Sequence, residues 1–184
     1  MAADHLKTKE ILIETSLQSF FFDQLQEINR KFTRPLPQEA IFYSSVVLDQ
    51  YGESNRYFEI QEGKVKEKIL GLKLLESSQL NASTQKRVLR DVGDTALMLC
   101  GYFGESLNKK LIDVRYYQDL GRMAYERLNN ILPEVYQVPD LFSLIARYFK
   151  ELTELLSFAA SRAHDKFDPH EAFIIVNTRP LKAS

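Results

Sequence analysis

Apolar residues recur every three or four positions over most of this sequence, which is the period of an α-helix that buries one face. The pattern predicts a first helix over about residues 9–31, and Thr33-Arg34-Pro35 ends it. The apolar stripe of this helix consists of Ile13, Leu17, Phe20, Phe21, Leu25, Ile28 and Phe32.

Two further helices are predicted in the next part of the chain. Pro37 suits the first turn of a helix, because the amide proton that proline lacks would have no partner there. Segment 52–63 is rich in turn formers and is interpreted as a connection. One side of the helix after Pro37 carries Ala40, Tyr43, Val47 and Tyr51. The inner face of the short helix after the connection is predicted to carry Val65, Ile69, Leu72 and Leu75.

A central helix is predicted over about residues 84–100, with its cap in the segment 81–84. Beyond Thr95 the polar side of this helix disappears, so its end is predicted to be buried on all sides. Its apolar stripe consists of Val88, Val92, Thr95, Ala96, Leu99 and Phe103. The opposite, polar side is formed by Lys86, Arg87, Arg90, Asp91 and Asp94.

The last two predicted helices complete an all-α fold. Asp113 caps one that runs to about Leu132, and the other runs from Pro139-Asp140 to about His164. We therefore predict a single-domain irregular helical bundle of about six helices over residues 1–168. An extended C-terminal tail, residues 169–184, follows it.

The segment VGDTALMLCGYFGESL, residues 92–107, holds three of the seven glycines and the only cysteine. A phosphate-binding loop is disfavoured, because a glutamate follows the last glycine where such loops carry lysine and a hydroxyl. We interpret Gly93 as a site of close helix contact, with Gly121 of the following helix as its partner. Gly101 or Gly104 would end the helix in a left-handed conformation. Cys100 lacks a neighbouring base and is interpreted as a buried structural thiol.

The composition excludes several classes of protein. Apolar residues make up 45% and aromatic residues 11% of the chain, which predicts a folded domain and not a disordered one. Lys and Arg, 24 in all, nearly balance 25 Asp and Glu, so overall charge gives no reason to expect a nucleic-acid partner. No apolar run is long enough to span a membrane, and one cysteine forms no internal disulfide. We therefore expect a cytoplasmic protein.

No catalytic constellation, cofactor site or metal site is predicted, since the three histidines lie near the two ends. A basic patch formed by Lys109, Lys110 and Arg115 is a possible ligand site for a nucleotide or phosphate. The tyrosines on the helices either pack in the core or line a cleft with polar ends.

The tail contains the one strongly β-prone run of the chain, namely Phe173, Ile174, Ile175 and Val176, with no obvious strand partner. This run either packs on its own bundle, pairs with a second copy of the chain, or docks on another protein. We therefore expect an interaction or regulatory protein that is not an enzyme, binding a protein partner or forming a homodimer. The alternatives are a small-molecule or nucleotide sensor with a tyrosine-lined cleft, and an enzyme without a readable motif.

Overall fold

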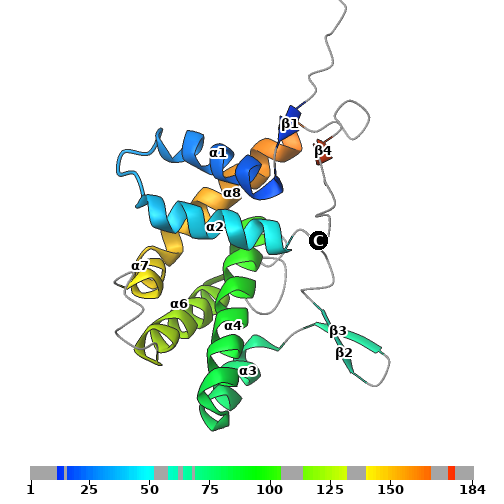
Figure 1. Cartoon of the computed structure of the whole chain (residues 1–184), viewed down its shortest axis with the longest axis vertical. Helices are drawn as coiled ribbons and strands as arrows, with labels where there is room; N and C mark the ends of the chain where they lie inside the picture. Colours follow the sequence, from blue (N-terminus) through cyan, green and yellow to red (C-terminus); the bar gives the residue numbers. More distant parts are fainter. Residues whose placement is uncertain are drawn as a thin grey trace, which may run out of the picture.

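The part of the chain that can be described folds as an all-α bundle, which confirms the predicted fold class (Figure 1). The computed structural model describes residues 12–14, 16–51, 58–61, 64–67, 69–104, 114–131, 140–166 and 174–176. Its helices are α1 (Leu17–Asn29), α2 (Gln38–Tyr51), α3 (Leu70–Glu76), α4 (Ala82–Tyr102), α6 (Val114–Ile131), α7 (Leu141–Arg147) and α8 (Phe149–Lys166). A short 3₁₀ turn, η2 (Ser77–Gln79), joins α3 to α4.

Among the residues described, four short strands lie outside the helices and form two separate pairs. In the first pair, β1 (Leu12–Glu14) runs parallel to β4 (Ile174–Val176). In the second, β2 (Phe58–Gln61) runs antiparallel to β3 (Lys64–Glu67). Two-stranded pairs of this kind are marginal on their own, so the helices carry the fold.

The first helix is shorter than the pattern predicts. Ser16 caps α1, and its side chain accepts a hydrogen bond from the amide of Ser19 at 3.1 Å. The predicted start near residue 9 is wrong, because Ile13 lies in β1, where it pairs with Ile175. A strand pairing with a segment far along the chain has overridden the local helical period.

A side-chain clasp sets the corner between α1 and α2. The side-chain nitrogen Nδ2 of Asn29 donates to the backbone carbonyl of Leu36 at 3.0 Å. The backbone N–H of Leu36 donates back to the side-chain oxygen of Asn29 at 2.8 Å. Both residues are buried. The clasp satisfies backbone groups that the turn leaves without helical partners, and it directs the chain into α2.

The predicted inner side of α2 is confirmed, since Ala40, Tyr43, Val47 and Tyr51 are all buried. The connection after it is not wholly irregular, because β2 and β3 form a hairpin within residues 58–67. The predicted face of the next helix is wrong. Val65 lies in β3, and α3 buries Leu70 and Leu74, while Ile69, Leu72 and Leu75 are exposed.

The two central helices, α4 and α6, pack closely. Asn81 caps α4 as predicted, accepting from the amide of Thr84 at 3.0 Å. Gly93 lies where an added Cβ would meet the ring of Tyr125 at 2.7 Å. An added Cβ at Gly121 would meet Phe149 and, at 2.9 Å, the Cβ of Ala96. Both glycines therefore permit close packing around this helix pair, but each receives a neighbouring side chain and not the other glycine.

Burial near the end of α4 is confirmed for Leu97 and Met98, which lie in the core, but Phe103 of the predicted stripe is 42% exposed. The predicted left-handed terminator is wrong. Gly101 lies inside the helix, where an added Cβ would meet Leu156 of α8 at 2.5 Å. The helix ends at Tyr102. Among the described residues other than glycine, Asp140 alone has a positive φ.

The last predicted helix is divided in two at Tyr148. The amide of Tyr148 bonds back to Leu144, and its carbonyl accepts from Leu152 at 2.8 Å, so α7 ends and α8 begins with little interruption. The bend places Phe149, which is 1% exposed, against Gly121. Neither glycine nor proline marks this break, so tertiary packing is its cause.

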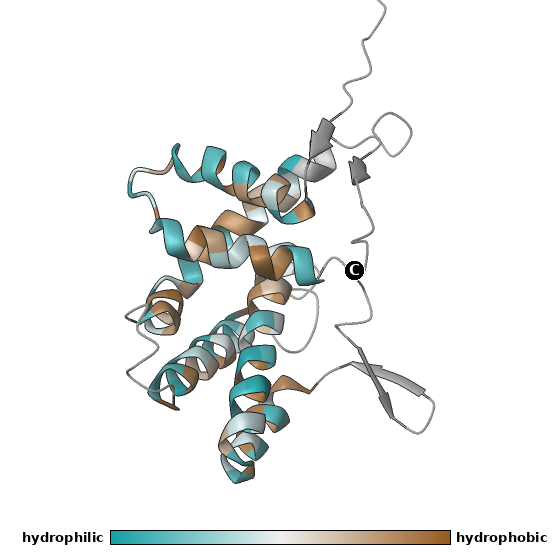
Figure 2. Cartoon of the chain, in the orientation of Figure 1, coloured by the Kyte–Doolittle hydropathy of each residue, from teal (hydrophilic) through white to brown (hydrophobic). Residues whose placement is uncertain are grey.

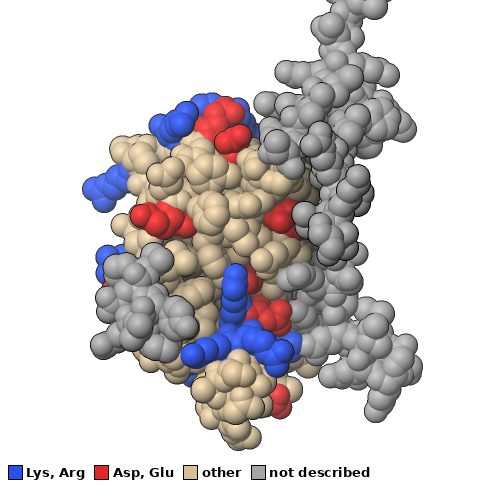
Figure 3. All heavy atoms as spheres, viewed as in Figure 1, with Lys and Arg blue, Asp and Glu red and all other residues tan. Residues whose placement is uncertain are grey.

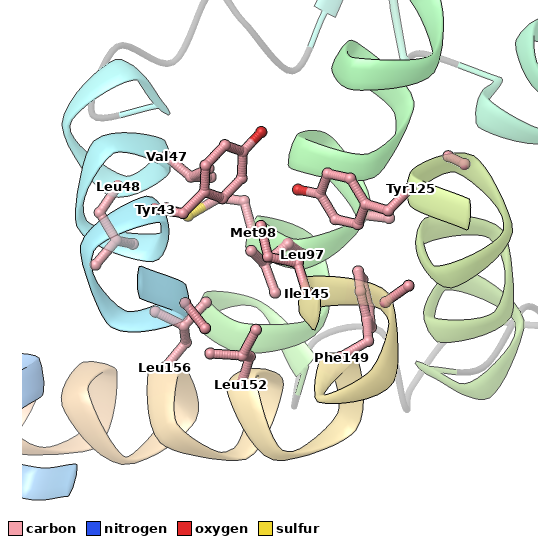
Figure 4. Close-up of a cluster of buried hydrophobic side chains, with 14 of the residues drawn as sticks. Tyr43, Val47, Leu48, Leu97, Met98, Tyr125, Ile145, Phe149, Leu152 and Leu156 are labelled. Atoms are coloured by element: carbon pink, nitrogen blue, oxygen red, sulfur yellow. The ribbon is translucent and has the colours of Figure 1, made fainter. Parts of the chain in front are cut away.

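The core lies where α2, α4, α6, α7 and α8 meet (Figure 4). Large apolar side chains from each of these helices interlock there, including Leu48, Leu97, Ile145, Leu152 and Leu156. Two tyrosines, Tyr43 and Tyr125, enter the same cluster with their hydroxyl groups on one side. This side of the core carries the polar site described next.

Candidate functional site

A buried carboxylate at the junction of α2, α4 and α6 is the most unusual chemical feature of the described residues. Asp94 of α4 is 3% exposed. Its Oδ1 accepts a hydrogen bond from the hydroxyl of Tyr43 at 2.5 Å and a second from the hydroxyl of Tyr125 at 2.7 Å. Figure 4 shows the two tyrosines extending toward each other from α2 and α6. One carboxylate oxygen thus connects three helices.

The other carboxylate oxygen is turned toward Arg90, one helical turn earlier. The Nε of Arg90 lies 3.6 Å from Oδ2 of Asp94, and the guanidinium lies over the ring of Tyr43 at 5.6 Å from its centroid. The side chain of Arg90 is 46% exposed, so it links the buried acid to the surface. Figure 3 shows Lys and Arg side chains gathered with acidic ones on the face over α4.

Burial sets the protonation chemistry of this cluster. Loss of solvent raises the pKa of Asp94 to about 6, and nearby Asp91 also raises it. The hydrogen bonds from Tyr43 and Tyr125 and the charge of Arg90 act in the opposite direction. Burial likewise raises the pKa values of both tyrosines well above their usual range. At neutral pH the tyrosines are therefore donors and Asp94 is close to its titration point.

A second polar group adjoins the first on α4. The hydroxyl of Tyr51 lies 3.1 Å from Thr95 and 3.3 Å from Oδ1 of Asp91. Oδ2 of Asp91 in turn accepts from Lys73 of α3 at 3.3 Å. This chain of contacts connects α2 and α3 to the same stretch of α4 that carries Asp94.

Aromatic rings cover the buried side of the carboxylate. Phe142 of α7 stacks on Tyr125 with ring centroids 5.8 Å apart, and it meets Tyr43 edge to face at 5.6 Å. Phe149 lies 6.0 Å from Tyr125. The described residues contain no buried side-chain nitrogen or oxygen without a hydrogen-bond partner. The cluster is therefore closed on its inner side, and its open side faces Arg90.

The sequence pattern predicts the burial of the tyrosines but not the buried carboxylate that they bind. The predicted place of Asp94 on the polar outer side of α4 is wrong, because tyrosines from α2 and α6 cover it. Core packing is confirmed for Tyr43, Tyr51 and Tyr125, which are buried. A signal was present, because Asp94 follows Gly93 directly and lies next to the segment predicted to be buried all round.

The predicted ligand patch is only partly described. Lys109 and Lys110 lie outside the described residues, while Arg115 is exposed in the first turn of α6. The patch stays a prediction. In the predicted partner-binding run, Phe173 also lies outside the described residues, and Ile174, Ile175 and Val176 form β4. These three residues pair with Leu12–Glu14 of the same chain, a partner that the sequence pattern did not indicate.

Cys100 behaves as predicted. Its side chain is buried at 4% exposure, and its Sγ lies 3.6 Å from the carbonyl of Val114, to which the thiol donates. Burial raises the pKa of the thiol to about 12, so the reactive thiolate is scarcely populated at neutral pH. Among the residues that can be described, no group of three His, Cys, Asp or Glu is placed to hold a metal ion.

An apolar surface on α3 is the second notable feature. Ile69, Leu72 and Leu75 are 66%, 49% and 68% exposed. Figure 2 shows hydrophobic colouring at the start of this helix, away from the core. We call these three residues the α3 stripe. Within the described helices, none is long and apolar enough to cross a membrane.

Comparison with known proteins adds no relative. No family model, no curated protein and no solved structure matches the chain. Functional inference therefore rests on the two features above, the Asp94 cluster and the α3 stripe.

Proposed function

We propose that the protein is a self-associating interaction protein that pairs with a second copy through the α3 stripe. The observation that carries this proposal is the exposure of Leu72 and Leu75 on α3, and of Ile69 at its N-cap, while the other large apolar residues of this short helix, Leu70 and Leu74, are buried. Large apolar side chains that gather on a surface favour association, because burying them removes apolar area from water.

The spacing of the stripe favours a second copy as the occupant. A two-fold contact places the same patch on both subunits, so the patch must be complementary to itself. The three residues are evenly spaced around Leu72. In an antiparallel pairing of two α3 helices, Leu72 therefore faces its own counterpart and Ile69 faces Leu75 of the second copy. The net charge of −1 adds almost no repulsion between copies.

Two other readings are supported less well. The tail run already has a strand partner in β1 for three of its residues, which reduces the need for an external one. The tyrosine-lined cleft of a sensor would need free phenols, whereas the hydroxyls of Tyr43 and Tyr125 are bonded to Asp94 and that of Tyr51 to Thr95 and Asp91.

Light scattering of the full-length protein over a range of concentrations tests the proposal. We expect a mass that rises toward twice that of the chain, and a Leu72→Glu variant that stays at the mass of one chain, since two carboxylates would then meet at the centre of the contact. The control is Phe158→Glu on α8, which adds the same charge at an apolar position of similar exposure, 57% against 49% for Leu72, and should leave association unchanged.

Two results would overturn the proposal. One is a wild-type protein that stays monomeric up to its highest soluble concentration. The other is a dimer that survives Leu72→Glu but is lost in a full-length Ile175→Pro variant, in which β4 lacks a backbone donor. The second result would assign association to the tail.

A further inference from the structure

In the Asp94 cluster the two carboxylate oxygens of Asp94 have different partners, so one added proton would affect those partners differently. Oδ1 accepts hydrogen bonds from two tyrosine hydroxyls that come from α2 and α6, whereas Oδ2 is turned toward Arg90. The two oxygens of one buried side chain thus have different tasks. One connects helices, and the other holds a half-exposed arginine.

We propose that Asp94 is a proton-operated latch for Arg90. In the ionised form, the carboxylate holds Arg90 at Oδ2. Uptake of one proton from solvent at Oδ2 removes the negative charge and places a hydrogen where the guanidinium was attracted, so Arg90 moves out to solvent. The hydroxyls of Tyr43 and Tyr125 keep donating to Oδ1, which is then the carbonyl oxygen of the acid.

The surroundings of Asp94 favour this asymmetric response. From α2 it faces Tyr43, with Tyr51 further along the helix, and from α6 it faces Tyr125; these groups are neutral throughout the relevant pH range. From α4 it faces Arg90 and, more remotely, Asp91, which is engaged with Lys73 of α3. The ring of Phe142 from α7 covers both tyrosines and carries no charge.

Arg90 is the one charged partner near Asp94 that is free to leave. Its Nε–Oδ2 distance of 3.6 Å is longer than a strong charge-assisted hydrogen bond, and nearly half of its side chain is in water. Its other contacts are with neutral Tyr43, whose ring lies under the guanidinium and whose side chain is also a hydrogen-bond partner of Arg90, and the attraction to the ring is weak at an exposed site. Burial and Asp91 bring the pKa of Asp94 to about 6, so the change falls between mildly acidic and neutral conditions.

The latch predicts that a surface arginine reports the protonation of a buried acid. NMR of the full-length protein tests this, following the side-chain carboxyl carbon of Asp94 and the Nε–Hε group of Arg90 from about pH 4 to about pH 8. We expect both signals to change with one shared midpoint near pH 6. In Asp94→Asn, which resembles the protonated acid, Arg90 should show its low-pH signal at every pH.

Arg122 on α6 is the matched control. It pairs with Glu126 at 2.9 Å and with Asp119 at 3.9 Å on the surface, so its signal should show no midpoint near pH 6 in either protein. A second variant, Arg90→Gln, should raise the midpoint of Asp94, because the positive charge of Arg90 lowers the pKa of that carboxyl group. The latch is rejected by an Arg90 signal that stays constant while Asp94 titrates. It is equally rejected by an Asp94 midpoint that does not move in Arg90→Gln.

Discussion

Replacing Gly93 with alanine tests the packing of α4 against α6, because it adds one methyl group at the tightest point of that contact. The new Cβ would lie 2.7, 2.8 and 2.9 Å from three ring atoms of Tyr125. The ring has little room to retreat, since Tyr125 is fully buried between Phe142 and Phe149 and its hydroxyl is bonded to Asp94.

Opposing effects determine the expected size of the change. Alanine is a better helix former than glycine by about 1 kcal/mol, whereas overpacking a core costs about 1–3 kcal/mol. Displacing the tyrosine hydroxyl from a charged acceptor costs about 1.5–3 kcal/mol more if that hydrogen bond is lost. We expect Gly93→Ala to lower the free energy of unfolding by about 1–3 kcal/mol, which is about 2–4 °C in Tm for each kcal/mol.

Urea denaturation followed by circular dichroism measures this difference. Gly104→Ala is the matched control, because an added Cβ there meets only Val114, at an ordinary 3.9 Å. That variant should be as stable as the wild type or slightly more stable. A Gly93→Ala protein more stable than the wild type by about 1 kcal/mol would refute the packing argument, since the helix-propensity gain would then meet no steric cost.

Two further predictions concern the titratable groups of the core. Because burial raises the pKa of Asp94 from 3.8 to about 6, the folded state holds a proton that the unfolded state releases, and stability falls as pH rises from about 4 to about 7. Relative to Asp94→Asn, the wild type should lose about 3 kcal/mol over this range, and a pH-independent difference in urea unfolding would contradict the assignment. Cys100 should react with a thiol reagent far more slowly in the native protein than in denaturant, and equal rates would show that the thiol is accessible.

The sequence predicts well those helices in which only one face carries apolar residues at helical spacing. For α4 and α6 the period, the Asn81 cap and the small residues Gly93 and Gly121 all agree, and the helix pair is confirmed. In α3 two stripes compete. Ile69 and Leu72 fit one face and Leu70 and Leu74 the other, and only packing against α4 and α6 decides between them.

The Asp94 site was beyond the reach of local patterns for a related reason. A charged residue one turn after Arg90 normally marks a solvated face. Its burial depends on hydroxyls that lie 51 and 31 residues away in sequence, on Tyr43 and Tyr125. Likewise, the break at Tyr148 has no local signal, because it arises from Phe149 fitting against Gly121 on another helix.

The clasp between Asn29 and Leu36 has a consequence for the order in which the chain folds. It joins residues only seven apart, whereas the hydrogen bond between Tyr43 and Asp94 closes a loop of 51 residues. Loop-closure entropy grows with the logarithm of length, so the shorter closure costs about 2 kcal/mol less. The α1–α2 corner is therefore expected to form early as a local unit. Tyr43 then lies on a helix, α2, whose direction is already set when it meets Asp94 and Tyr125. Formation of the buried cluster is therefore expected to be a late step.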